Sequence, residues 1–554
     1  TLDFYFTKMK QKSIRFVKNC MVKKGFVLLF LFSFLLSQDK LLLKQADTLT
    51  SSVVESETIT KLNGNIIFQK TDTILKGDFA TQSNQTPIIN LYGNVSIEDG
   101  NQMIYCDSLL YNNETEFFSM YGNIKIQNGS RFMTAKKATL DQISNQMTLL
   151  ENCEINDKQN NRVYGDKILL GFKDESLESL KVISSGMILS KNSGYKKIDD
   201  KRQLVENEDV LKGETIFAEL INDKIENIEM VGMASTLIHL YNDSLYDGIN
   251  KISGDKIILS IKNESAQKLI AEGGTIGKYT PNESNENVKE DIDYTADRVE
   301  FEVNTKISEM YGGVKILHDN MDLSAAHINV DWETNILEAF SDNPFDDEEI
   351  NRPILVENNR EPMTGDTMVY NIKSRKGKIL MGESRVQENV YMGSQITSVT
   401  DSTFYIDDCI FTSCDPSKFY IGSKQVKIIY GDKVIAKPLN IFIGGVPIIG
   451  IPIAIFPHSS NERRSGWIMP SFGSSDNRGN YLDGLGYYFA PNDYIGSENS
   501  IIFADRQGLI LKSKNQYRDR YRFNGMFNFE IRKHLGKGET DIAQIGENNK
   551  TDYS

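Results

Sequence analysis

A Gly-Asn pair recurs along the first part of this chain at a constant interval. The three pairs are Gly64-Asn65, Gly93-Asn94 and Gly122-Asn123, spaced by 29 and 29 residues. A second series lies between them, spaced by 29, 29 and 30 residues: Gly77-Asp78, Cys106-Asp107, Ala135-Lys136 and Gly165-Asp166. A fixed internal period indicates stacked copies of one small structural unit. Two such series predict two strands per period, each introduced by a turn.

Apolar residues follow both series with period-two spacing, which predicts strands with one buried and one wet face. After the Gly-Asn series they are Ile66, Phe68, Val95, Ile97, Ile124 and Ile126. After the second series, which continues irregularly, they are Leu109, Tyr111, Ile168, Leu170, Ile257, Leu259, Val299, Phe301, Ile328, Val330, Met368 and Tyr370. Some nine stacked strand pairs predict an all-β, solenoid-like structure, with polar loops at 193–211, 281–293 and 341–361.

These apolar faces have two interpretations. They fill the core of the stack, or they line an open V whose interior holds acyl chains. Periodicity alone does not choose between the two.

Residues 21–38 predict a secretory signal peptide. Two lysines precede a short apolar core that ends in a small residue, and such a core is too short for a stable anchor. Residues 1–20 precede the natural start, Met21, and we expect them to be untranslated. The net charge of −14 argues against nucleic acid as a partner.

Four cysteines follow the signal peptide, and an even number in an exported protein permits disulfides. Cys409 and Cys414 are close enough in sequence to pair. They also resemble half of a metal site, but no second Cys or His pair completes it, so we predict no metal and no cofactor.

Residues 438–473 mark a change in the character of the chain. The sixteen residues 441–456 form a nearly unbroken apolar run. The run contains Gly444, Gly445, Gly450, Pro447 and Pro452. A membrane-spanning helix needs about 20 apolar residues, and glycine and proline disfavour one here. The segment therefore predicts short extended pieces, followed by a basic joint.

Beyond Ser465 aromatic residues become frequent, and residues 521–531 alternate cleanly between two faces. A tilted transmembrane strand needs about 9–11 residues. Turn-forming clusters at 474–480, 490–493 and 536–538 leave room for five or six strands in 466–554. We expect an incomplete barrel, and hence the N-terminal fragment of a longer protein.

Several blocks together resemble the lipopolysaccharide-assembly outer-membrane protein family, LptD, also called organic solvent tolerance protein. The blocks are Thr412-Ser-Cys-Asp-Pro, Gly445-Val-Pro-Ile, Ile455-Phe-Pro, Arg463-Arg-Ser-Gly-Trp-Ile-Met-Pro and Tyr487-Tyr-Phe-Ala-Pro-Asn. The upstream repeats are similar to that family's periplasmic OstA-type β-jellyroll. The resemblance covers residues 41–530.

The resemblance implies a periplasmic jellyroll at 41–437, an apolar junction at 438–465 and the first strands of an outer-membrane barrel at 466–554. It implies non-enzymatic transport of lipopolysaccharide, with the inward apolar residues above as lipid contacts. A periplasmic bridge protein would pair near residues 64–76, and a plug lipoprotein would sit in the barrel. Lipid would leave through a lateral gate at the residues Arg463, Arg464, Gly466, Pro470 and Gly486, the last standing where the family often has proline.

Two alternatives stay open. A soluble periplasmic bridge or scaffold could use the same jellyroll, although the aromatic C-terminal strands argue against it. A β-helix enzyme acting on carbohydrate could use paired carboxylates such as Asp297 or Asp366. Aspartate recurs at the repeat in most copies, which favours a structural turn role.

Overall fold

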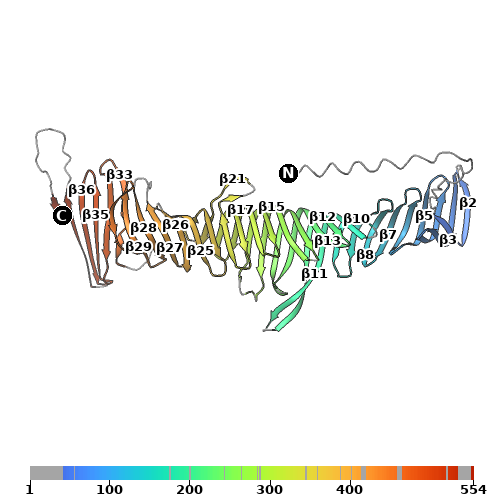
Figure 1. The fold of residues 1–554 in the computed structure, drawn as a ribbon, viewed down its shortest axis with the longest axis horizontal. Coiled ribbons are helices and arrows are strands. Elements are labelled where there is room, and N and C mark those ends of the chain that lie inside the picture. Colours follow the sequence, from blue (N-terminus) through green and yellow to red (C-terminus); the bar gives the residue numbers. More distant parts are fainter. Residues whose placement is uncertain are drawn as a thin grey trace, which may run out of the picture.

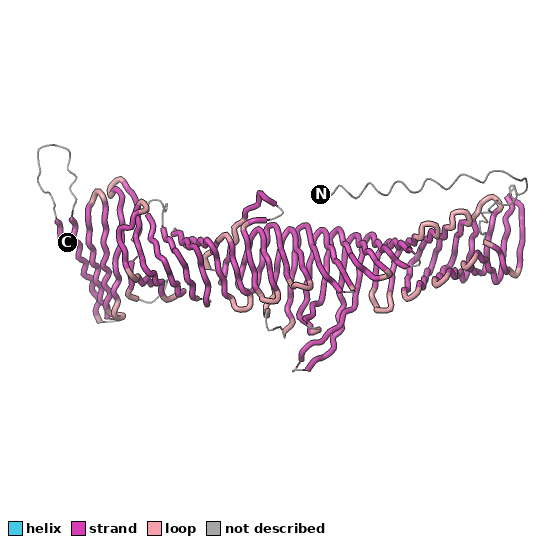
Figure 2. The backbone as a smooth tube through the Cα atoms, in the orientation of Figure 1, coloured by secondary structure: helices cyan, strands magenta, loops and turns pink. Residues whose placement is uncertain are grey.

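The computed structural model describes residues 41–553 except 55–56, 174–175, 199–200, 243, 264, 284, 286–287, 344–345, 359, 387–388, 401, 413–418, 458–463, 469, 520–521 and 534–550. Within these residues every regular element is a strand, so no helix there could span a membrane. Figure 2 shows strands joined by short loops along the whole length of the molecule. The predicted all-β class is confirmed. The predicted signal peptide, 21–38, lies outside the described residues.

Among the described residues from 42 to 457, twenty-nine strands form one sheet, which is antiparallel except for a single parallel bridge. Its first half consists of β1 (Leu42–Gln45), β2 (Thr48–Val54), β3 (Glu57–Lys70), β4 (Thr73–Ser83), β5 (Ile88–Asp99), β6 (Gln102–Asn112), β7 (Phe117–Asn128), β8 (Arg131–Asp141), β9 (Gln146–Asn156), β10 (Arg162–Lys173), β11 (Ser176–Ile198), β12 (Lys201–Ile221), β13 (Lys224–Asn242), β14 (Leu245–Lys262) and β15 (Ser265–Pro281). Its second half consists of β16 (Ile292–Glu302), β17 (Ile307–His318), β18 (Met321–Asp331), β19 (Ile336–Phe340), β22 (Ile354–Glu357), β23 (Met363–Thr364), β24 (Thr367–Asn371), β25 (Lys376–Val386), β26 (Asn389–Thr400), β27 (Thr403–Thr412), β28 (Phe419–Ile429), β29 (Lys433–Ile443), β30 (Val446–Ile451) and β31 (Ala454–Pro457).

Most of the long strands bend at their midpoint, and the repeated residues lie at these bends. Gly93 and Asn94 sit in the middle of β5 with φ values of 74° and 44°, where the register with β4 shifts. The Asn94 side chain donates a hydrogen bond to Asp78 Oδ2 at 2.7 Å. Asn123 and Asp107 repeat this contact at 2.8 Å. The two series therefore meet at one corner of the sheet, glycine supplying the positive φ and aspartate accepting from asparagine.

This arrangement corrects one expectation from the sequence. The period does hold two strands, but the repeated residues bend strands and do not introduce them. Turns and bulges both favour glycine and asparagine with positive φ, so the sequence signal is the same. The true turns lie between the corners, for example at Thr71, φ 46°, and Gly100, φ 55°.

The corners divide the folded sheet into two walls. Wall A holds the strand halves 59–63, 79–83, 88–92, 108–112 and 117–121 and their successors, and wall B holds 66–70, 73–77, 95–99, 102–105 and 124–128 and their successors. The inward side chains of both walls form a single buried core along the sheet. We call the edge opposite the corners, where the turns of wall A approach those of wall B, the mouth.

Two of the three predicted loops contain strands. Residues 193–198 and 201–211 belong to β11 and β12, which pair up to Ile198 and Lys201 and project from the stack as a hairpin in Figure 1. Residues 341–361 contain β20 (Asp342–Asn343) and β21 (Asp346–Ile350), which pair with each other, and β22. Both stretches are polar, but backbone pairing does not need an apolar face. Between β15 and β16, the described residues 282–283, 285 and 288–291 form no strand.

A separate sheet follows at the C-terminal end of the stack (Figure 1). Its strands are β32 (Gly466–Ile468), β33 (Ser471–Ser475), β34 (Gly479–Phe489), β35 (Ile495–Ala504), β36 (Gly508–Asp519), β37 (Phe523–Lys533) and β38 (Thr551–Tyr553). The predicted strand 521–531 overlaps β37, and the predicted turn at 490–493 falls between strands. The turn predicted at 474–480 is confined to 476–478, because its ends belong to β33 and β34, and the turn predicted at 536–538 lies outside the described residues.

Candidate functional site

The predicted inward residues share one apolar core between walls A and B. Seventeen of the eighteen are between 0 and 7% exposed, and Phe301 packs against the same core. The seventeen are Ile66, Phe68, Val95, Ile97, Leu109, Tyr111, Ile124, Ile126, Ile168, Leu170, Ile257, Leu259, Val299, Ile328, Val330, Met368 and Tyr370. Period-two spacing thus assigned the inward face correctly. Their role as lipid contacts stays a prediction.

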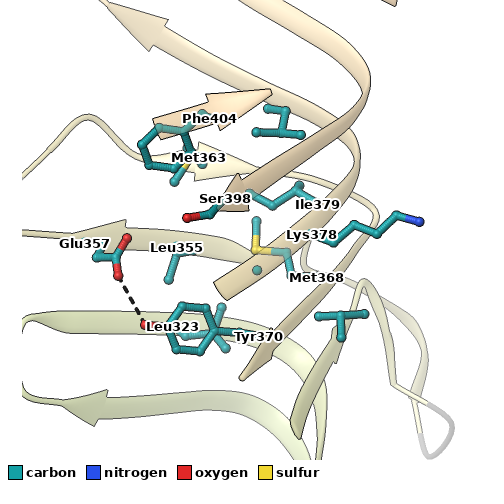
Figure 3. Close-up of a pocket in the computed structure, with 13 residues that line it drawn as sticks. Leu323, Leu355, Glu357, Met363, Met368, Tyr370, Lys378, Ile379, Ser398 and Phe404 are labelled. Carbon is teal, nitrogen blue, oxygen red and sulfur yellow. Dashed lines mark hydrogen bonds between the residues drawn. The ribbon is translucent and has the colours of Figure 1, made fainter. Parts of the chain in front are cut away.

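The core is tightly packed where β22 to β25 meet. A cavity of about 20 Å³ lies where β22 to β25 meet, lined by Leu355, Met363, Met368 and Ile379 among others (Figure 3). Such a space holds about one water molecule. An acyl chain therefore fits between the walls only if they move apart.

Polar and aromatic contacts join the two walls across the mouth. Tyr370 on wall A donates a hydrogen bond to Glu357 Oε1 on wall B at 3.1 Å, as Figure 3 shows. The other contacts pair Lys70 with Glu116, Asp99 with Gln142, Arg131 with Asp223, Asn242 with Lys306, Asp319 with Arg375 and Arg360 with Tyr430. We refer to these seven pairs as the mouth contacts. Each joins a wall-B residue to a wall-A residue, and together they extend from β3 to the turn after β28.

The mouth contact of Asp223 affects its ionisation. Burial disfavours the charged carboxylate, but hydrogen bonds from the Leu177 N–H and from Arg131 outweigh it and lower the pKa of Asp223. The Arg131 guanidinium lies 2.9 Å from Asp223 Oδ1. This contact is therefore charged at neutral pH.

The apolar run found in the sequence forms the last strands of the folded sheet, β29 to β31. Unlike the core, it exposes large apolar side chains, 37 to 58% accessible. We call these the junction strip: Ile443, Val446, Ile448, Ile449, Ile453 and Ile455. Ile441 on β29 is fully buried in the core, so core and strip are continuous along one strand. Exposed apolar patches of this kind mark membrane or partner contacts.

The predicted gate residues lie where the two sheets join. Arg464 forms an ion pair with Asp432 of the folded sheet, and Phe472 of β33 stacks on Phe419 of β28 at 5.2 Å. Gly466 pairs with Tyr488. Arg463 lies outside the described residues.

Pro470 lies between the first two short strands of the C-terminal sheet. β32 ends at Ile468 and β33 starts at Ser471, and both pair with β34. Proline lacks the N–H that a ladder needs. Gly486 is instead paired on both sides, with Ile468 and with Ser500. Pro470 thus lies in neither strand and Gly486 is paired, and their role in a gate stays a prediction.

One face of the C-terminal sheet carries many apolar residues on four strands, with Ser497, Asn499, Ser513 and Asn515 among them. Leu485, Ile501, Leu511 and Ile531 are successive cross-strand partners, so they share a face. The same face carries further exposed apolar residues: Tyr487, Phe489, Ile495, Phe503, Tyr517, Phe527 and Phe529. The opposite face carries Glu498, Lys512, Lys514, Asn528 and Glu530. Long strands with apolar and polar faces are typical of a transmembrane barrel wall.

The predicted disulfide partner Cys414 lies outside the described residues. Cys409 is buried on β27 as a free thiol. Burial raises the pKa of Cys409 to about 12, so this thiol is protonated and unreactive at neutral pH. The pairing of Cys409 with Cys414 stays a prediction.

The strands that hold the expected docking residues are not at the edge of the sheet, and docking of a bridge protein stays a prediction. Residues 64–76 belong to β3 and β4, which are paired on both sides. In the described part of the chain, the open edge is formed by β1 and β2, which pair only with β3. Leu42, Leu49 and Val53 on these strands are more than half exposed.

Comparison with known proteins gives matches at both ends of the chain. Residues 38–164 match the model of the OstA-like protein family, and residues 434–554 match the model of the LptD protein family. The LPS-assembly protein LptD of Hahella chejuensis is 25% identical over 160 residues, which is 28% of this chain and 20% of that protein.

Two other relatives carry the same name. The protein of Burkholderia cenocepacia is 26% identical over 225 residues, covering 40% of this chain and 24% of that protein. The protein of Burkholderia thailandensis is 28% identical over 217 residues, covering 37% and 25%. The chain thus spans about a quarter or less of the length of these relatives. The chain thus resembles OstA-like proteins near one end and LptD proteins at the other.

Proposed function

We propose that this chain transports lipopolysaccharide from the periplasm to the outer membrane, without catalytic chemistry. One observation carries the proposal. A continuous apolar core runs from Ile66 to Ile441 and ends beside the exposed junction strip. The relatives, which are named LPS-assembly proteins, support the same role.

The acyl chains would occupy the space between walls A and B once the mouth opens. Each methylene removed from water contributes about 0.8 kcal/mol, so a lipid with several acyl chains needs such shielding in the periplasm. The sugars and phosphates would stay outside the mouth, in water.

The junction strip and the C-terminal sheet would deliver the lipid to the membrane. The strip exposes isoleucine and valine next to β32, and the apolar face of β34 to β37 would contact lipid tails. Proline at position 470 weakens strand pairing, which suits a lateral exit there. The chain would therefore lie in the outer membrane, with the folded sheet in the periplasm.

Two partners follow from this proposal. A periplasmic bridge protein with a similar sheet would pair with the open edge of β1 and β2, because unpaired strand edges recruit additional strands. A plug lipoprotein would occupy the completed barrel.

Depletion of the protein in its own cells tests the function. We expect lipopolysaccharide on the cell surface to fall, and newly made lipopolysaccharide to accumulate inside. Normal surface lipopolysaccharide after depletion would contradict the proposal. Recovery of the protein in the soluble fraction without detergent would favour the soluble bridge or scaffold instead.

A further inference from the structure

Cationic side chains recur along the mouth of the folded sheet. Five of the seven mouth contacts include one: Lys70, Arg131, Lys306, Arg360 and Arg375. The chain as a whole carries a charge of −14, so this row is not a consequence of composition. Three of the cations pair with the carboxylates Glu116, Asp223 and Asp319.

Arg360 differs from the other four cations. Its guanidinium lies over the ring of Tyr430, 4.4 Å from the centroid, and 5.7 Å from that of Phe404. Within the described part of the chain, its Nη1 is buried and has no hydrogen-bond partner. A buried donor without an acceptor destabilises the folded state. An anionic oxygen at this position would remove that destabilisation.

The position of Arg360 suits the cargo. It lies on the turn between β22 and β23, and it contacts Phe404, which lines the cavity together with Leu355 and Met363. If acyl chains lay between the walls, the first polar groups of the lipid would lie outside the core, at the level of Arg360. Arginine binds phosphate through paired hydrogen bonds, and it does so while stacked on an aromatic ring.

We propose that the mouth cations, and Arg360 above all, bind the phosphate groups of the transported lipid. This rests on the function proposed above and adds a recognition site to it. In the closed sheet Glu116, Asp223 and Asp319 neutralise their cations. When acyl chains separate the walls, the lipid phosphates replace these carboxylates as partners, so opening does not leave the cations unpaired.

Photocrosslinking at Ile379, which lines the cavity, tests Arg360. The probes are purified lipid A with two phosphates and the same lipid A with both phosphates removed. We expect the diphosphorylated form to label more strongly. Arg360→Gln should lower its labelling about tenfold, the change that one charge-assisted hydrogen bond gives, while Arg360→Lys should restore part of it.

Lys427 provides the matched control. Its Nζ lies over the Tyr405 ring at 5.4 Å, on the outer face of wall A, so Lys427→Gln should leave labelling unchanged. Equal labelling by the two lipids would overturn phosphate recognition while leaving the transport proposal intact. No labelling by either lipid at Ile379 would instead contradict the transport proposal.

Variants of Arg131 and Asp223 distinguish phosphate binding from a purely mechanical role of this contact in holding the mouth closed. Either Arg131→Gln or Asp223→Asn removes the ion pair, so a purely mechanical contact predicts more labelling at Ile126 in both variants. Phosphate binding predicts an increase of about 1.5- to 5-fold for Asp223→Asn, the range that one partly exposed ion pair allows, and a decrease for Arg131→Gln. An equal increase in both would overturn the proposal at this position.

Discussion

The phenol of Tyr370 donates a hydrogen bond to Glu357 Oε1 at 3.1 Å, and this bond joins the two walls of the folded sheet across its mouth (Figure 3). Both residues are buried, at 5% and 6% exposure. A carboxylate in an apolar core is retained only with such partners. The buried carboxylate of Glu357 therefore has this hydrogen bond only while the mouth is closed.

Removing this hydroxyl should destabilise the closed sheet. Tyr370→Phe leaves Glu357 with one hydrogen bond fewer, and we expect a loss of about 1–3 kcal/mol in the free energy of unfolding. Urea denaturation of the purified protein measures it. Tyr105→Phe, at a half-exposed outer position, is the control and should change stability by less than about 0.5 kcal/mol. Equal effects in both variants would refute the role of the contact.

The corner glycines should tolerate no side chain. Gly122 has φ 75°, and a Cβ there would lie 2.2 Å from Asp107 Oδ2. Gly129, in a turn, has φ 56° and nothing within 4 Å of its Cβ position. Both alanine variants incur the left-handed strain of about 1–2 kcal/mol, but Gly122→Ala adds a clash with the corner aspartate. Thermal melting should show the larger loss for Gly122→Ala, and equal losses would argue against the corner contact.

Acid should weaken the contact between Arg131 and Asp223. The pKa of Asp223 is lowered in the folded protein, so the unfolded state binds the proton more readily. The stabilisation is therefore present above the unfolded pKa, about 3.9, and is lost as pH falls through the folded value. Urea midpoints between pH 7 and pH 3 should fall less steeply in Asp223→Asn and in Arg131→Gln. Unchanged slopes in both would contradict this.

The two faces of β37 should respond differently to a charge. Phe527 lies on the apolar face and Asn528 on the polar face. Phe527→Lys would place an ammonium against lipid, at a cost of up to about 2–4 kcal/mol near the membrane centre, and should lower the amount of protein assembled in the outer membrane. Asn528→Lys should assemble normally. Membrane fractionation compares the two, and the reverse result would reverse the assignment of faces.

Much of the fold followed from local pattern. Alternation alone identified the inward rows, because in a strand every second side chain faces the same way. Val95 and Ile97 on β5 are 1% exposed, as their spacing predicts. The long alternating run near the C-terminus likewise gave β37. The position of the corners did not follow, since Gly-Asn satisfies a turn and a bulge equally well.

The mouth contacts could not be predicted from the sequence. Arg131 and Asp223 are 92 residues apart, and Lys306 and Asn242 are 64 apart. These separations in sequence depend on how many strands lie between a turn of wall B and the turn of wall A that it contacts. No local pattern encodes that offset. For the same reason, nothing around Arg360 in the sequence indicated a buried donor over Tyr430.

Photocrosslinking at Ile126 in living cells tests the central claim, that acyl chains pass between walls A and B. Ile126 is 2% exposed and points inward, while the adjacent Lys125 is exposed on the outer face of the same strand. A photoreactive residue at position 126 should form an adduct with lipopolysaccharide, and the same residue at position 125 should not. Adducts at 125 with none at 126 would show that lipid does not enter the folded sheet.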